Sequence, residues 1–163
     1  MMALFQHIVV AYDKFDHSGE ALLLGNQLAN QLNAKLTIVH VHSPSLDEVV
    51  AEATPRMHMG GYVADGTPVP PPTAFEHQEK PIRLDQLKQN IVAEIQQFIP
   101  VTDQMTIEVV EGEPEKLLPK LAESLQADLI ITGKRNASLK KLLFGSISEK
   151  MAKATDTPVL VVK

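Results

Sequence analysis

His7-Ile8-Val9-Val10-Ala11-Tyr12 is a short apolar run rich in β-branched residues, and Asp13 follows it. A run of this kind is typical of a strand buried on both faces, as in a parallel sheet. Residues 35–41 (KLTIVHV) form a second run of the same type. Between the two runs, Ser18 suits the N-cap of a helix. The apolar residues of that helix recur at three- and four-residue spacing: Ala21, Leu24, Leu28, Ala29 and Leu32.

The same alternation continues to the end of the chain. We expect helices over residues 83–99, from Pro114 onward and from near Ser146, and strands over residues 105–110, 128–132 and 159–162. Strands that alternate with amphipathic helices indicate the α/β class, with a doubly wound five-stranded parallel sheet and helices on both faces. Ligands of such sheets bind outside the carboxyl ends of the strands, where the strand order reverses.

The length of 163 residues suits a single domain spanning residues 1–163. One stretch breaks the alternation, because seven of the eleven prolines lie between residues 43 and 82. Proline removes backbone donors and biases the preceding residue toward extended conformations. We therefore expect a Pro-rich loop insertion at about 43–82.

The bulk composition excludes several classes of protein. A formal net charge of -5 argues against a nucleic-acid partner or an anionic membrane. The chain has no cysteine, which excludes disulfides and thiolate metal sites and fits a reducing compartment. Its start reads as a strand rather than a signal peptide, and no apolar stretch approaches the ~18 residues that span a bilayer. We expect a cytoplasmic protein.

The segment from Gly133 to Glu149 follows a predicted strand and enters a predicted helix. Ser146 and Glu149 have capping-box spacing, and Gly145 allows the backbone to approach a ligand closely. The amides and dipole of a helix start favour phosphate. Positive charge gathers here, from Lys134, Arg135, Lys140 and Lys141. Taken alone, these residues fit two alternatives about equally. One is a phosphate site, and the other is a basic surface loop before an ordinarily capped helix.

At this segment the chain resembles the universal stress protein family, whose nucleotide loop reads G-x2-G-x9-G-[ST]. Gly133 matches the first glycine, and Gly145-Ser146 match the final pair. Asn136 stands at the second glycine, and eight residues instead of nine separate it from Gly145. The similarity covers nearly the whole chain and includes the Asp after the first strand, His40-Val41, Gly112 to Pro114, and T-P-V-L-V-V at residues 157–162.

This resemblance implies a strand order of 3-2-1-4-5 and a stress-response regulatory protein that binds an adenine nucleotide, ATP or a relative, with or without Mg²⁺. Ala11 and Asp13 would lie near the adenine and ribose, Val41 would meet the base through its backbone, and Gly112 would approach the sugar. The phosphate end of the site would comprise Gly133, Arg135, Asn136, Gly145, Ser146 and Ile147.

A second interpretation is a dimeric interaction module of the same fold that binds no nucleotide. The substitution at Asn136, the shortened loop and the bulky Phe15 favour it, because the family has D-G-S after the first strand. An Asp at this position is also common as a plain helix-entry residue. Both interpretations include an unidentified protein partner and a homodimer through Val159–Val162, an apolar strand expected at the sheet edge.

Catalysis and metal binding find little support. No Walker loop, G-x-G-x-x-G or G-x-S-x-G occurs, and no base, nucleophile and orienter set is evident, so we expect at most slow ATP hydrolysis. His40 and His42 alternate on a predicted strand without a third ligand, which favours packed or hydrogen-bonded histidines. His58, between two methionines, is a weak soft-metal motif.

Overall fold

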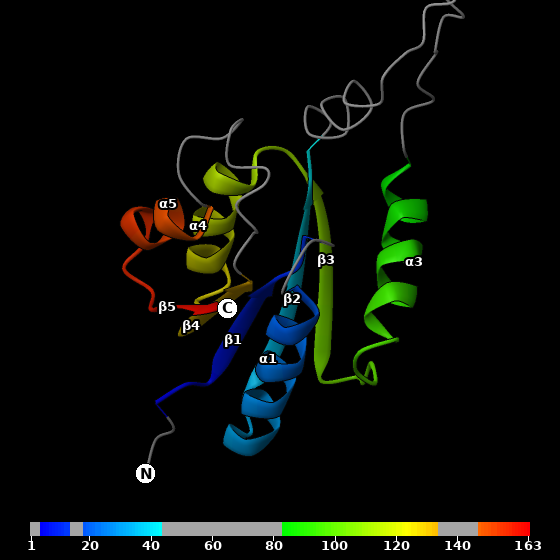
Figure 1. Ribbon diagram of the computed structural model, residues 1–163, viewed down its shortest axis with the longest axis horizontal. Helices are drawn as coiled ribbons and strands as arrows, with labels where there is room; N and C mark the ends of the chain where they lie inside the picture. Colours follow the sequence, from blue (N-terminus) through cyan, green and yellow to red (C-terminus); the bar gives the residue numbers. More distant parts are fainter. Residues whose placement is uncertain (1–3, 14–17, 44–82, 134–146) are drawn as a thin grey trace, which may run out of the picture.

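The computed structural model describes residues 4–13, 18–43, 83–133 and 147–163 (Figure 1). The Pro-rich segment 44–82, with His58, lies outside these residues. The helices and strands alternate along the chain in this order: β1 (His7–Ala11), α1 (Ser18–Leu32), β2 (Lys35–His42), α3 (Leu84–Ile95), β3 (Met105–Glu111), α4 (Pro114–Ser124), β4 (Leu129–Gly133), α5 (Ile147–Ala154) and β5 (Val159–Val162).

The five strands form one sheet in the order β3-β2-β1-β4-β5, and every neighbouring pair is parallel. This confirms the predicted fold class and strand order. After β1, the chain adds β2 and then β3 on one side of it. The chain then crosses to the other side of β1, where it adds β4 and then β5. Ala11 pairs with Val39 on one side and with Thr132 on the other. The strand order therefore reverses between β1 and β4, where α/β sheets of this type bind ligands.

Side chains alternate between two buried layers along β1. Ile8 and Val10 belong to a core cluster that includes residues of α1 and α3, whereas Val9 and Ala11 belong to a second cluster with residues of α4 and α5. Figure 1 shows the same division, with α1 and α3 apart from α4 and α5. Since both faces are covered, β1 is apolar at every position between its ends, as its sequence indicated.

A glycine allows α1 to pack closely onto the sheet. Gly25 lies in the middle of α1, and a Cβ atom placed there would lie 2.4 Å from Cγ2 of Val10 in β1. Such a distance is far below van der Waals contact, so a larger residue would have to push helix and strand apart. The low helix propensity of glycine is thus offset by the packing of α1 on the sheet.

Polar side chains form hydrogen bonds between the amino ends of neighbouring strands. The Asp128 carboxylate accepts hydrogen bonds from the backbone N–H groups of Gln6 and His7, at 2.7 and 2.9 Å. The buried His7 ring donates from Nδ1 to the Leu125 carbonyl (2.8 Å), and its Nε2 lies 2.7 Å from the Thr37 hydroxyl. These contacts tie β1 to β2 and to the start of β4, at the edge of the sheet opposite the predicted ligand site.

The helix predicted over residues 83–99 ends four residues earlier in the structure than predicted. In the structure α3 ends at Ile95, and a turn carries the chain to Ile99. Pro100 follows, and a proline disfavours helical conformation in the residue before it. The apolar spacing continued past the helix because Ile99 is still buried. Elsewhere the element boundaries match to within two residues.

None of the helices in the described ranges combines the length and apolarity needed to cross a membrane.

Replacing Gly25 by alanine tests the close approach of α1 and β1. We expect Gly25→Ala to lower the free energy of unfolding by about 1–3 kcal/mol through overpacking against Val10, although alanine is the better helix former. Urea unfolding measures the change. Gln27→Ala, at an exposed position of the same helix, is the control and should be nearly neutral. Equal or greater stability of Gly25→Ala would contradict the packing described.

Candidate functional site

Four predicted site residues lie at the carboxyl edge of the sheet. Ala11 ends β1, Val41 is the penultimate residue of β2, Gly112 directly follows β3, and Gly133 ends β4. The strand register brings these ends together, because β1 pairs with both β2 and β4 and Val41 pairs with Val110 of β3. Ile147 is the first residue of α5. Arg135, Asn136, Gly145 and Ser146 lie outside the residues that the structure describes.

Gly112 has a conformation that strongly favours glycine. Its φ is +149°, and a Cβ atom there would lie 2.5 Å from Cδ1 of Leu117. Its N–H donates to the His42 carbonyl (2.9 Å), which extends the β2–β3 pairing to the end of the sheet. Pro114 then occupies the first turn of α4, as predicted. The fold itself thus requires this glycine, whether or not a ligand approaches it.

Asp13 and Ser18 contact each other across the connection between β1 and α1. The Ser18 hydroxyl donates to the Asp13 carboxylate, and the Asp13 N–H donates to the Ser18 hydroxyl oxygen at 3.4 Å. Ser18 is 2% exposed, whereas Asp13 is partly accessible. The sequence indicated Ser18 only as the N-cap of the helix, whereas in the structure it is the first residue of α1. Its contact with a predicted site residue was not predicted.

Tyr12 fixes the backbone directly before Asp13. Its N–H donates to the Val39 carbonyl, and its own carbonyl accepts from Nδ1 of His40, each at 2.8 Å. Its hydroxyl donates to the Glu94 carboxylate of α3 at 3.1 Å. Burial raises the pKa of Tyr12 to about 12, helped by the Glu94 charge and hydrogen bond and by the Asp13 charge. The neutral phenol is therefore the form present at neutral pH.

The two strand histidines are buried, and His40 is hydrogen-bonded, in agreement with the predicted packed or hydrogen-bonded histidines. His40 and His42 are buried, at 6% and 9% exposure. The His40 ring also lies against Tyr12, with 6.4 Å between ring centroids. Among the described residues, no group of three or more His, Asp and Glu side chains could hold a metal ion.

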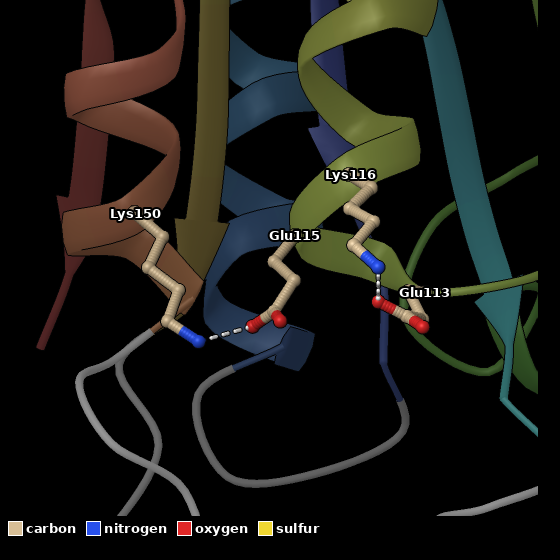
Figure 2. Close-up of polar contacts among 4 residues, drawn as sticks. All are labelled: Glu113, Glu115, Lys116 and Lys150. Carbon is tan, nitrogen blue, oxygen red and sulfur yellow. Dashed lines mark hydrogen bonds and ion pairs between the residues drawn. The ribbon is translucent and has the colours of Figure 1, made fainter.

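Two ion pairs lie at the starts of α4 and α5 (Figure 2). Lys150 of α5 contacts Glu115 of α4 at 2.6 Å, and Lys116 contacts Glu113 at the same distance. The hydrogen bond and charge of Glu113 raise the pKa of Lys116. The Lys116–Glu113 pair is exposed and contributes little to stability, whereas the Lys150–Glu115 pair is partly buried. The Glu115–Lys150 pair joins α4 to the first turn of α5, and these two helices cover one face of the sheet.

Comparison with known proteins gives one consistent result. The sequence model of the universal stress protein family matches residues 4–58 and 61–163. The stress response protein NhaX of Bacillus subtilis is 33% identical over 162 residues, which cover 96% of each chain. A universal stress protein in complex with cAMP superposes with a TM-score of 0.59 at 23% identity, covering 97% of this chain and 96% of that chain. The universal stress protein from Archaeoglobus fulgidus in complex with dAMP superposes with a TM-score of 0.54 at 16% identity, covering 99% of this chain and 100% of that chain.

The environment of Tyr12 can be tested by its titration. The chain has two tyrosines and no tryptophan, so a Tyr62→Phe variant leaves Tyr12 as the only source of tyrosinate absorbance. We expect a midpoint near 12, and a lower one after Glu94→Gln. Because the folded pKa exceeds the unfolded value of about 10, the stabilisation by this group is complete below that pH and is lost as the pH rises toward 12. A midpoint near 10 in the folded protein would contradict the burial and the Glu94 contact.

Proposed function

Because this chain belongs to the universal stress protein family, we propose that it is a stress-response regulatory protein that binds an adenine nucleotide at the carboxyl edge of its sheet. The observation that carries the proposal is the convergence of Ala11, Val41, Gly112 and Gly133 at one edge. These residues lie at or directly after the ends of four strands around the point where the strand order reverses, and α/β sheets bind nucleotides at such points.

The phosphate end of the site is assigned to the segment between β4 and α5. Gly133 ends a strand at the carboxyl edge, and α5 begins at Ile147. The first N–H groups of a helix lack intrahelical acceptors, and the helix dipole favours an anion there. In this proposal Gly133, Asn136, Gly145 and Ser146 surround the phosphates, and Arg135 supplies positive charge.

The base is assigned as adenine. Two solved family structures similar to this chain hold cAMP and dAMP, both of which are adenine nucleotides. In this chain the Val41 backbone would meet the base, while Ala11 and Asp13 would lie near the base and ribose. ATP is the proposed ligand, and titrations with and without Mg²⁺ would establish whether the ion accompanies it.

Isothermal titration of the full chain with ATP tests the function, and paired serine variants test the location of the phosphates. We expect saturable binding of one ATP per chain. Ser146→Ala should weaken it by about tenfold, through loss of a hydrogen bond to a charged phosphate. Ser148→Ala, two residues further along, is the matched control and should leave the affinity unchanged. No binding by the wild type would contradict the proposed function and favour the alternative of an interaction module without nucleotide.

A homodimer through β5 is the second part of the proposal. Among the residues that the structure describes, β5 lies at the sheet edge and pairs with β4 alone. Leu160 in its middle is 38% exposed. An edge strand with apolar side chains is a template for pairing with another strand. A second copy of the same strand would satisfy both its backbone groups and its apolar side chains.

A charge placed in β5 tests this interface. We expect the wild type to have the mass of a dimer in light scattering, and Val161→Lys to shift it to the mass of a monomer, because a lysine ammonium would have to be desolvated at the interface. Leu23→Lys, at a 49% exposed position of α1, adds the same charge elsewhere and should leave the dimer intact. An unchanged dimer in Val161→Lys would place the interface on another surface.

A further inference from the structure

Ser18 has a contact that its helix position alone does not explain. Its side chain is almost fully buried, yet its hydroxyl donates to the carboxylate of Asp13 at the carboxyl edge of the sheet. The same hydroxyl oxygen accepts the Asp13 N–H, at 3.4 Å. Backbone and side chain of Asp13 are thus both held by one buried group, five residues further along the chain.

The backbone on the other side of Asp13 is also fixed. The N–H and carbonyl groups of Tyr12 bond to Val39 and to the His40 ring, and its hydroxyl bonds to Glu94. A carboxylate at the end of a strand would ordinarily rotate about its side-chain bonds, and a ligand that needed one orientation would bear the entropy cost. The contacts around Asp13 already restrict this rotation in the protein without a ligand, so binding loses less entropy.

From these contacts we infer that Ser18 is a positioning residue for the nucleotide site, acting through the Asp13 carboxylate; the inference rests on the proposed function. A carboxylate accepts about four hydrogen bonds, so the bond from Ser18 is compatible with further bonds from a ligand. An ionised Asp13 attracts the hydroxyl and amino donors of a nucleoside and repels phosphate. Ser18 therefore contributes to recognition of the nucleoside end of the ligand, not of its phosphates.

The test is a double-mutant cycle, read by isothermal titration of the full chain with ATP and with ADP. We expect Ser18→Ala to weaken both ligands by the same factor, about tenfold, since the lost orientation concerns the nucleoside that they share. Asp13→Ala should weaken them at least as much. In the Asp13→Ala background, Ser18→Ala should cause no further loss. Ser18→Thr keeps the hydroxyl and should restore most of the affinity.

Ser124→Ala is the control, because it removes an exposed hydroxyl at the end of α4, at the opposite edge of the sheet. Urea unfolding of each variant establishes that it is folded at the titration temperature. If wild type binds ATP and Ser18→Ala binds it equally well, the inference is overturned and the proposed function stands. Losses that multiply in the double variant would show that Ser18 acts independently of Asp13, and a larger loss for ATP than for ADP would show an effect on the phosphates; either result overturns the inference. A wild type that binds neither ligand overturns both proposals.

Discussion

The burial of β1 on both faces is the constraint on which the rest of the structure depends. Its apolar residues pack alternately under α1 and α3 and under α4 and α5, while its backbone pairs with β2 on one side and β4 on the other. A strand in this position cannot shift by one residue without exchanging the two layers. The end of β1, and with it the reversal of strand order, is therefore fixed within the sheet.

That fixed end explains why polar groups gather there. Tyr12 is still buried, but its hydroxyl and backbone need partners, and Glu94, Val39 and His40 provide them. One residue later the chain reaches solvent at Asp13, which Ser18 holds. A buried apolar strand thus ends in a short polar segment whose groups are mostly oriented by other groups of the protein. A binding site for a polar ligand requires such an arrangement.

The sequence predicted the α/β class and most element boundaries because apolar runs and helical spacing are local signals. The strand order came from the resemblance to the universal stress protein family. The resemblance also indicated Ala11, Val41, Gly112 and Gly133, and the structure brings them to one edge because parallel strands share their carboxyl ends. The bond between Tyr12 and Glu94 was missed because it joins residues distant in the chain. The contact of Ser18 with Asp13 was missed for another reason, since capping already explained a serine near a helix start. The binding roles of all the site residues remain predictions, and Arg135, Asn136, Gly145 and Ser146 also lie outside the described residues.

Amide chemical shifts recorded by NMR during an ATP titration test the central claim most directly, because they report binding and its location together. We expect saturable changes in chemical shift at the carboxyl edge, around Ala11 to Asp13, Val41, Gly112 and Gly133. We expect no changes at the amino edge, where His7 and Asp128 form hydrogen bonds between the strands. Changes centred on the amino edge, or no changes at all with excess ATP, would contradict nucleotide binding at the carboxyl edge.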